Sequence, residues 1–111
     1  MRENVKCLKK INWTNTRHDL VSKKVFYTGD FFESNITQIA YSELQAGQII
    51  DPHSHNSMDE VFFLINGICE FIIDDKCYTA RAQSVISIPA KHIHSLRAIS
   101  LCKFYYFGVE I

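Results

Sequence analysis

The chain of 111 residues is long enough for one domain with a single core, and 47% hydrophobic with 22% charged residues is ordinary for a globular protein. With 12 basic and 12 acidic residues the formal net charge is zero, so there is no global electrostatic basis for binding nucleic acid or an anionic membrane. No apolar run approaches the ~18 residues that a membrane-spanning helix needs.

The leading segment is basic, which sets it apart from the rest of the chain. Residues 1–24 hold seven lysines and arginines against Glu3 and Asp19. Because the segment lacks a periodic or low-complexity basic pattern, we interpret it as exposed and solvated rather than as a nucleic-acid-binding arm. We expect residues 1–30 to form an N-terminal arm and edge strands of the same domain as a barrel in residues 31–111.

The cysteines and the first residues favour a reducing compartment. The beginning of the chain has no apolar h-region and no small-residue cleavage site, so we expect no signal peptide. Four cysteines occur singly, without a C-x-x-C pair, at Cys7, Cys69, Cys77 and Cys102. We therefore expect reduced thiols and a cytoplasmic location.

Strand patterns dominate the rest of the chain. Short β-rich runs occupy residues 35–44, 60–65, 68–73, 76–80, 84–89 and 95–111. No window of 12 residues keeps an apolar stripe of helical period. The sequence therefore predicts an all-β fold of short antiparallel strands, closed into a small β-barrel or two-sheet sandwich because open sheet edges invite aggregation.

One hairpin is predicted in detail. Asn66-Gly67 lies between two apolar runs, which is typical of a two-residue type I′ turn. The predicted pairs are Ile65–Ile68, Leu64–Cys69, Phe63–Glu70 and Phe62–Phe71. One face then holds Glu60, Phe62, Leu64, Cys69, Phe71 and Ile73, and we expect it to point inward. The other holds Val61, Phe63, Ile65, Ile68, Glu70 and Ile72. Asp74-Asp75 indicates a second two-residue turn.

Two histidines one residue apart carry the functional signal. His53 and His55 could be turn residues of a polar loop, but side chains at i and i+2 of a strand point to the same side. An antiparallel return would bring Glu60 to their level on the inward face, where a carboxylate needs a partner. His94 opens a later strand and offers a fourth donor. This pattern favours a metal site, whereas His18, in a polar segment, is expected to be exposed.

These residues resemble the cupin family. The first cupin motif, G-x5-H-x-H-x4-E-x6-G, is matched at every fixed position by Gly47, His53, His55, Glu60 and Gly67. The second, G-x5-P-x-G-x2-H-x3-N, is matched only in part. Pro89 and His94 fit it, and Gln83, Lys91 and Ala98 replace its two glycines and its asparagine.

The resemblance implies a small jelly-roll β-barrel with a metal at its mouth. Carried over by motif position, the ligands are His53, His55, Glu60 and His94. Three imidazoles and a carboxylate suit Fe²⁺, Mn²⁺, Ni²⁺ or Zn²⁺, and an octahedral ion would keep two positions for substrate, O₂ or water. Lys91 replaces the second glycine of the second motif and is therefore expected to need a positive φ.

Several further residues have alternative interpretations. His92 is read as exposed or beside the ligands, and Tyr41 and Tyr106 are candidates for contact with ligands or substrate. Cys69 is expected to be a core thiol and Cys77 to point outward. Cys102 beside the tyrosines leaves open a thiol–tyrosine arrangement. In residues 103–107, Phe104 and Tyr106 should share one face, and Tyr105 and Phe107 the other.

The function that we expect is metal-dependent catalysis on a polar small molecule, such as a sugar derivative or a small carboxylate, by an oxygenase, isomerase or lyase; the catalytic residues stay unassigned. Basic residues near the motifs that could contact a substrate are Arg81, Lys91 and Arg97. A non-catalytic metal- or ligand-binding module is one alternative. A metal-free isomerase or epimerase with His53 or His55 as base is another. The outward apolar side chains predict a homodimer.

Overall fold

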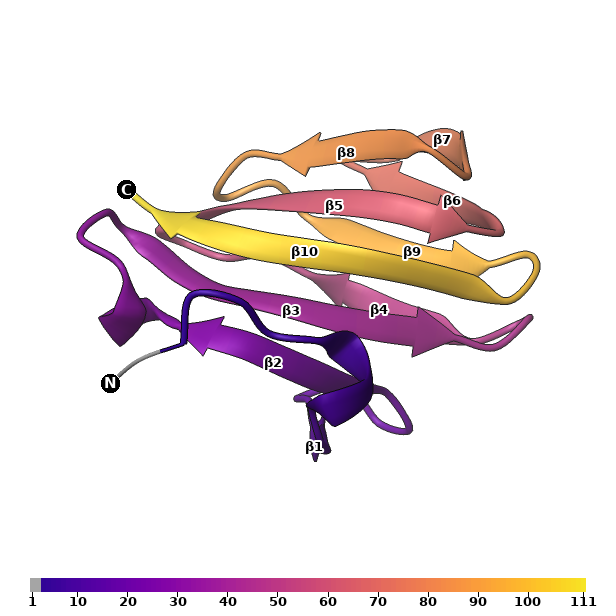
Figure 1. Cartoon of the computed structure of the whole chain (residues 1–111). Coiled ribbons are helices and arrows are strands. Elements are labelled where there is room, and N and C mark those ends of the chain that lie inside the picture. Colours follow the sequence, from indigo (N-terminus) through magenta and orange to yellow (C-terminus); the bar gives the residue numbers. More distant parts are fainter. Residues whose placement is uncertain (1–2) are drawn as a thin grey trace.

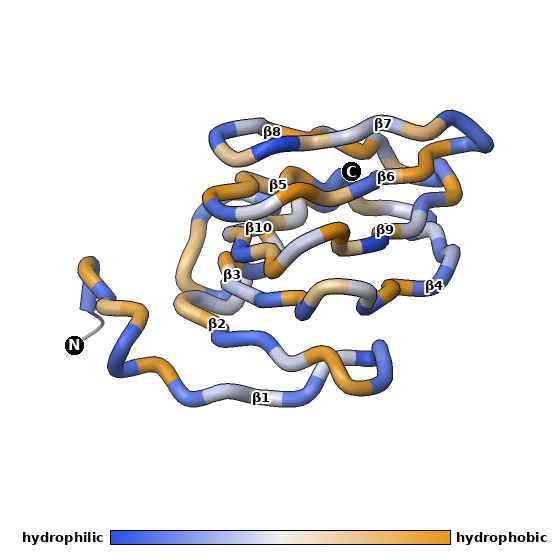
Figure 2. The backbone as a smooth tube through the Cα atoms, turned by 90° about the vertical axis from the view of Figure 1, so that its right-hand side faces the viewer, coloured by the Kyte–Doolittle hydropathy of each residue, from blue (hydrophilic) through white to orange (hydrophobic). Residues whose placement is uncertain are grey.

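The computed structural model describes residues 3–111, so Arg2, one of the seven basic residues of the leading segment, lies outside the described part. Ten antiparallel strands form two sheets that face each other (Figures 1 and 2). The six-stranded sheet has the order β1 (Trp13–Asn15), β2 (Ser22–Thr28), β3 (Ile36–Leu44), β10 (Cys102–Glu110), β5 (Met58–Asn66) and β8 (Ser84–Ile88). The four-stranded sheet has the order β4 (Ile49–His53), β9 (His94–Ala98), β6 (Ile68–Ile73) and β7 (Lys76–Arg81).

The predicted all-β fold is therefore confirmed. The helical structure described in residues 3–111 consists of two single 3₁₀ turns, η1 (Leu8–Lys10) and η2 (Gly29–Phe31). No helix within this part of the chain is long and apolar enough to cross a membrane. Strands β1 and β2 extend one edge of the six-stranded sheet, so the N-terminal segment is attached to the same sheet as β3, β5 and β10.

The core lies between the two sheets and is built by strict alternation of side chains. Phe62 and Leu64 of β5 are 5% and 1% exposed, whereas Phe63 between them is 42% exposed. The predicted inward face is confirmed by the burial of Phe62, Leu64, Cys69 and Phe71. Phe104 and Tyr106 likewise turn toward the core, as predicted for alternate residues of one strand.

The predicted Asn66-Gly67 hairpin is wrong. Strands β5 and β6 do not pair with each other: β5 pairs with β10 and β8, and β6 pairs with β7 and β9. Gly67 adopts φ +90°, and a Cβ there would collide with the Leu101 carbonyl. The Asn66 side-chain amide donates to the same carbonyl over 3.0 Å. The dipeptide is thus a corner at which the chain passes from one sheet to the other, and both strands keep the predicted inward faces.

The true two-residue hairpin is the one at Asp74-Asp75. Both aspartates have positive φ, 48° and 67°, as a type I′ turn requires. Strands β6 and β7 pair from Ile73–Lys76 through Ile68–Arg81. This second turn prediction is therefore confirmed.

The outward apolar side chains are divided between two surfaces, because β5 and β6 belong to different sheets. Phe63 and Ile65 lie on the outer face of the six-stranded sheet, and Ile72 lies on the outer face of the four-stranded sheet. Trp13 of the N-terminal segment packs against Tyr41 with ring centroids 6.1 Å apart, which covers part of the first surface. The single apolar face expected from the hairpin does not exist.

The cysteines lie where alternation predicts them. Cys69 is a buried core thiol and Cys77 is exposed, as expected. Cys102 is also buried, and its thiol donates to the Ile68 carbonyl over 3.1 Å. Burial raises the pKa of Cys69 to about 12 and also raises that of Cys102, so both thiols stay protonated.

Candidate metal centre

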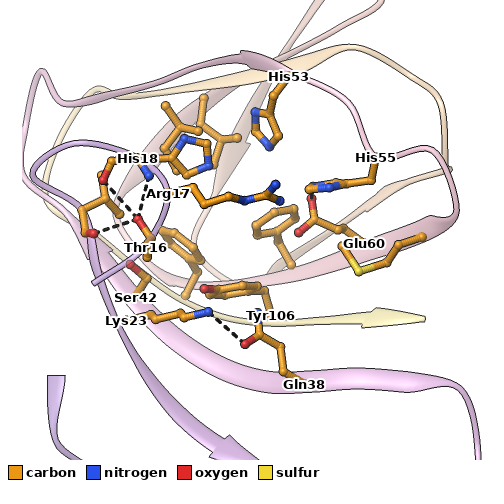
Figure 3. A pocket seen from close by; sticks show the side chains of 16 residues that line it. Thr16, Arg17, His18, Lys23, Gln38, Ser42, His53, His55, Glu60 and Tyr106 are labelled. Carbon is orange, nitrogen blue, oxygen red and sulfur yellow. Dashed lines mark hydrogen bonds and ion pairs between the residues drawn. The ribbon is translucent and has the colours of Figure 1, made fainter. Parts of the chain in front are cut away.

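The four predicted ligands come together at one end of the sandwich. The donor atoms of His53, His55, Glu60 and His94 all lie within 4.8 Å of one another. His53 ends β4 directly opposite His94, the first residue of β9, and His55 follows two residues after His53. Glu60 belongs to β5 of the other sheet and faces the histidines from across the interior (Figure 3). The carboxylate therefore reaches the site from the opposite sheet, not by the antiparallel return beside β4 that we predicted.

Backbone carbonyls orient two of the three imidazoles. His53 Nδ1 lies 2.8 Å from the Asp51 carbonyl oxygen, and His94 Nδ1 lies 3.0 Å from that of His92. A carbonyl only accepts, so each Nδ1 carries a proton. The Nε2 atoms are thereby left as the donor atoms, an arrangement found for most histidines that bind metals.

The surroundings of the His55 side chain indicate whether a metal fits this site. Its Nε2 lies 3.1 Å from Glu60 Oε1, yet the direction is unsuitable for a hydrogen bond. In residues 3–111 it is the one buried side-chain nitrogen or oxygen without a hydrogen-bond partner. Leaving such an atom unsatisfied costs about 1–3 kcal/mol. A cation among the four donor atoms would satisfy it, so the residues present fit a metal.

The charge states of His53 and Glu60 also suit metal binding. Burial lowers the pKa of His53, which favours the neutral ring that a metal needs. Burial acts to raise the pKa of Glu60, but its hydrogen bond with His94 and the nearby imidazoles outweigh this and lower it. His94 has the opposite balance: burial alone would lower its pKa, and Glu60 raises it. Glu60 therefore stays a carboxylate, and its pairing with His94 favours a proton on that ring in the metal-free protein.

A cavity of about 140 Å³ opens beside the four donor atoms. Its size is close to that of a cavity of ~150 Å³ that accepts one benzene molecule. Phe62, Leu96 and Phe104 form an apolar floor, and Tyr106 lies against it. The site therefore has room for one small molecule next to the donor atoms.

Of the other predicted site residues, the structure brings Tyr106 to the cavity but not Tyr41 or His92. Tyr106 lines the cavity, and burial raises its pKa, so its hydroxyl stays protonated as a hydrogen-bond donor. Tyr41 lies on the outer face of the sheet, where its hydroxyl donates to Glu43 over 2.8 Å, and is not brought to the cavity. His92 is exposed and pairs with Asp74, and its carbonyl holds His94 in place.

Five cavity residues come from the N-terminal segment and were not predicted from the sequence, namely Thr16, Arg17, His18, Val21 and Lys23. Arg17, His18 and Lys23 line the mouth of the cavity (Figure 3). The expectation that His18 is exposed is wrong: its ring is half-buried, with its centroid 4.7 Å from that of His53. The local sequence does not predict that these residues line the cavity, because the turn that carries them approaches the cavity only through the pairing of β2 with β3.

The basic residues singled out from the sequence do not line the cavity. Arg97 pairs with Glu70 on the surface, and Arg81 is exposed on β7. Lys91 adopts φ +75°, which confirms the positive φ expected at the lost glycine, and Gln83 has the same φ. The Lys91 backbone N–H donates to the His55 carbonyl over 2.7 Å, so this turn still supports a ligand.

Comparisons with known proteins bear on the family and on the fold. The family whose sequence model matches, over residues 40–107, is described as Cupin domain. A predicted oxalate decarboxylase from Thermotoga maritima has a TM-score of 0.88 at 15% identity, with 96% of this chain and 99% of that one covered. KdgF from Halomonas sp. has a TM-score of 0.77 at 12% identity, with 95% and 94% covered. An RmlC-like cupin from Shewanella frigidimarina has a TM-score of 0.81 at 10% identity, with 99% and 93% covered.

No curated protein matches the sequence. At these identities the solved structures bear on the fold alone, and they support the double-sheet jelly-roll barrel that the motifs imply.

Proposed function

The chain belongs to the cupin family, and from that premise we propose that it is a small metal-dependent enzyme acting on a polar small molecule. His53, His55, Glu60 and His94 would hold one divalent transition metal. The observation that carries this proposal is the buried His55 Nε2, which has no hydrogen-bond partner among the described residues and lies among three further donor atoms.

The donor set restricts which metals are suitable. Three imidazoles and one carboxylate suit Fe²⁺, Mn²⁺, Ni²⁺ or Zn²⁺. A bound metal would supply Lewis-acid polarisation and orientation of a substrate oxygen, with O₂ activation added if it is iron. The chain itself would exclude water with its apolar floor and offer the Tyr106 hydroxyl as a hydrogen-bond donor. These residues support catalysis on a molecule that fits the small cavity.

Two alternatives make different predictions. A non-catalytic binding module would hold metal and ligand without turnover. A metal-free isomerase with His53 as base would leave the buried His55 Nε2 unsatisfied. With either His53 or His55 as base, the remaining donor atoms would have no role. The proposed enzyme is favoured over the binding module because a protonated phenol stands beside the donor atoms in the cavity.

Anaerobic purification followed by elemental analysis tests the metal, and a turnover screen tests catalysis. We expect about one divalent transition metal per chain, and consumption of O₂ or of a small polar substrate by the loaded protein. A chain that takes up none of the four metals would contradict the metal site. Full metal content without turnover on any sugar derivative or small carboxylate would instead favour the binding module.

We further propose a homodimer formed through the outer face of the six-stranded sheet. Tyr105, Phe63 and Val85 are neighbours in one row across β10, β5 and β8, and Phe63 stacks on Phe107 with ring centroids 6.2 Å apart. Phe63 and Val85 are 42% and 60% exposed. Burying such a patch would stabilise an assembly by roughly 25 cal/mol per Å² of apolar area.

Phe63→Lys is therefore expected to convert the dimer into monomer or aggregate, because it places an unpaired charge in the interface. Size-exclusion chromatography with light scattering reads the mass directly. Ile72→Lys, on the outer face of the other sheet, is the matched control and should leave the dimer intact. A wild-type protein with the mass of one chain, 12.9 kDa, at micromolar concentration would contradict the dimer.

A further inference from the structure

The mouth of the cavity carries positive charge that the metal ligands do not use. Arg17, in the turn between β1 and β2, directs its guanidinium into the cavity toward His55 and Glu60 (Figure 3). Within residues 3–111 this guanidinium has no hydrogen-bond acceptor and no ion-pair partner. Arginine presents a planar fork of donors that matches a carboxylate in two parallel hydrogen bonds. Arg17 is exposed, and its unpaired fork at the open side of the cavity is therefore available to a ligand.

The turn that carries Arg17 is fixed in place. Thr16 Oγ1 accepts a hydrogen bond from the His18 backbone N–H over 3.0 Å and donates to the Val21 carbonyl over 2.8 Å. The Gln48 side-chain amide donates to the Leu20 carbonyl over 3.1 Å, which ties the turn to the chain just before β4. The backbone of the turn that carries Arg17 is thus held by three hydrogen bonds, so a ligand would have to order the Arg17 side chain but not the turn.

The charges around the cavity favour an anion. Lys23 adds a second cation to the lining, where its Nζ donates to Gln38 Oε1 over 3.1 Å. Glu60 is the one carboxylate among the lining residues, and it is engaged with the histidines. A metal held by Glu60 would use that negative charge, so the two basic side chains would be left unbalanced. A substrate that carries negative charge would restore the balance.

We propose that Arg17 is the residue that recognises the substrate and that the substrate is a small carboxylate. The inference rests on the proposed function and narrows its substrate class. The cavity of about 140 Å³ suits a carboxylate of a few carbon atoms better than a sugar phosphate. The carboxylate would pair with Arg17, and a second oxygen of the same molecule would lie between the metal ligands and the Tyr106 hydroxyl. The structure therefore replaces Arg81, Lys91 and Arg97 with Arg17 as the residue that contacts the substrate.

Calorimetric titration of the metal-loaded protein with lactate and with lactamide tests this assignment. The two probes have the same shape, and only lactate is charged. We expect the wild type to bind lactate more tightly than lactamide. Arg17→Gln should weaken lactate binding about 10- to 100-fold, as loss of one charge-assisted pair implies, and leave lactamide unchanged. The lactate affinity of Arg17→Lys should lie between those of the wild type and Arg17→Gln, because lysine keeps the positive charge and lacks the planar fork of donors. Arg81→Gln is the matched control and should bind like the wild type.

Metal content is measured on every sample, so that the two proposals fail separately. Protein that holds no metal refutes the proposed function. Protein that holds metal and binds lactate equally well with and without Arg17 refutes the present inference and leaves the metal site standing. Equal weakening of lactate and lactamide by Arg17→Gln would also overturn it, because the role would then be structural. Tighter binding of inorganic phosphate than of lactate by the wild type would overturn the assignment to carboxylates.

Discussion

His55→Ala is expected to abolish stoichiometric metal binding while the protein stays folded. Changing groups that only support metal ligands costs about 10- to 100-fold in affinity, so loss of a direct ligand should cost more than about 100-fold. His55 lies in the connection after β4, outside the hydrophobic core cluster. Elemental analysis after dialysis gives the metal content, and circular dichroism reports the fold.

The same variant separates a metal ligand from a structural histidine. In the metal-free protein His55 Nε2 makes no hydrogen bond, so removing the ring should change the free energy of unfolding by no more than about 1 kcal/mol. A histidine that mainly held the fold together would show a larger loss. The matched control is His92→Ala, which removes an exposed ring and keeps the backbone carbonyl that orients His94. If His55→Ala retains full metal content, the ligand assignment is wrong.

Three of the four proposed ligands could be predicted to lie together because their spacing in the sequence is local. His53 and His55 are separated by one residue, and a single short connection leads to Glu60. The inward direction of Glu60 followed from alternation with Phe62 and Leu64, and the structure confirms it. Alternation depends only on the pleat of one strand, so it holds whichever strand becomes the neighbour.

Strand pairing was harder to predict, and Asn66-Gly67 shows why. The dipeptide has the positive φ at glycine that a hairpin turn would use, so its local chemistry was read correctly. What turns it into a corner is contact with Leu101, which is remote in sequence. Asp74-Asp75, a weaker turn signal, forms the real hairpin. Local sequence thus indicated that the chain turns at both places, but not which strands become partners.

The cavity mouth could not be predicted for a similar reason. Arg17 and His18 lie in a polar stretch that reads as an exposed loop. Their position depends on the pairing of β2 with β3 and on the hydrogen bond from Gln48 to the Leu20 carbonyl. Sequence patterns placed the donor atoms within the barrel, whereas the residues proposed to recognise the substrate became visible only through tertiary contacts.

Phe62→Ala is expected to lower the free energy of unfolding by about 3–5 kcal/mol, a large part of the 5–15 kcal/mol typical of a domain. The ring is 5% exposed and packs against Phe71, Phe104 and Tyr106 with centroids 5.6, 5.8 and 5.6 Å away. Urea unfolding at matched metal content measures the loss.

Phe62→Leu, which keeps most of the volume, should cost about 1.5 kcal/mol or less and covers the case in which the alanine variant does not fold. Tyr78→Ala, an aromatic residue of β7 that is 48% exposed, is the control and should cost far less than Phe62→Ala. Equal losses for Phe62→Ala and Tyr78→Ala would mean that Phe62 does not occupy the core between the two sheets.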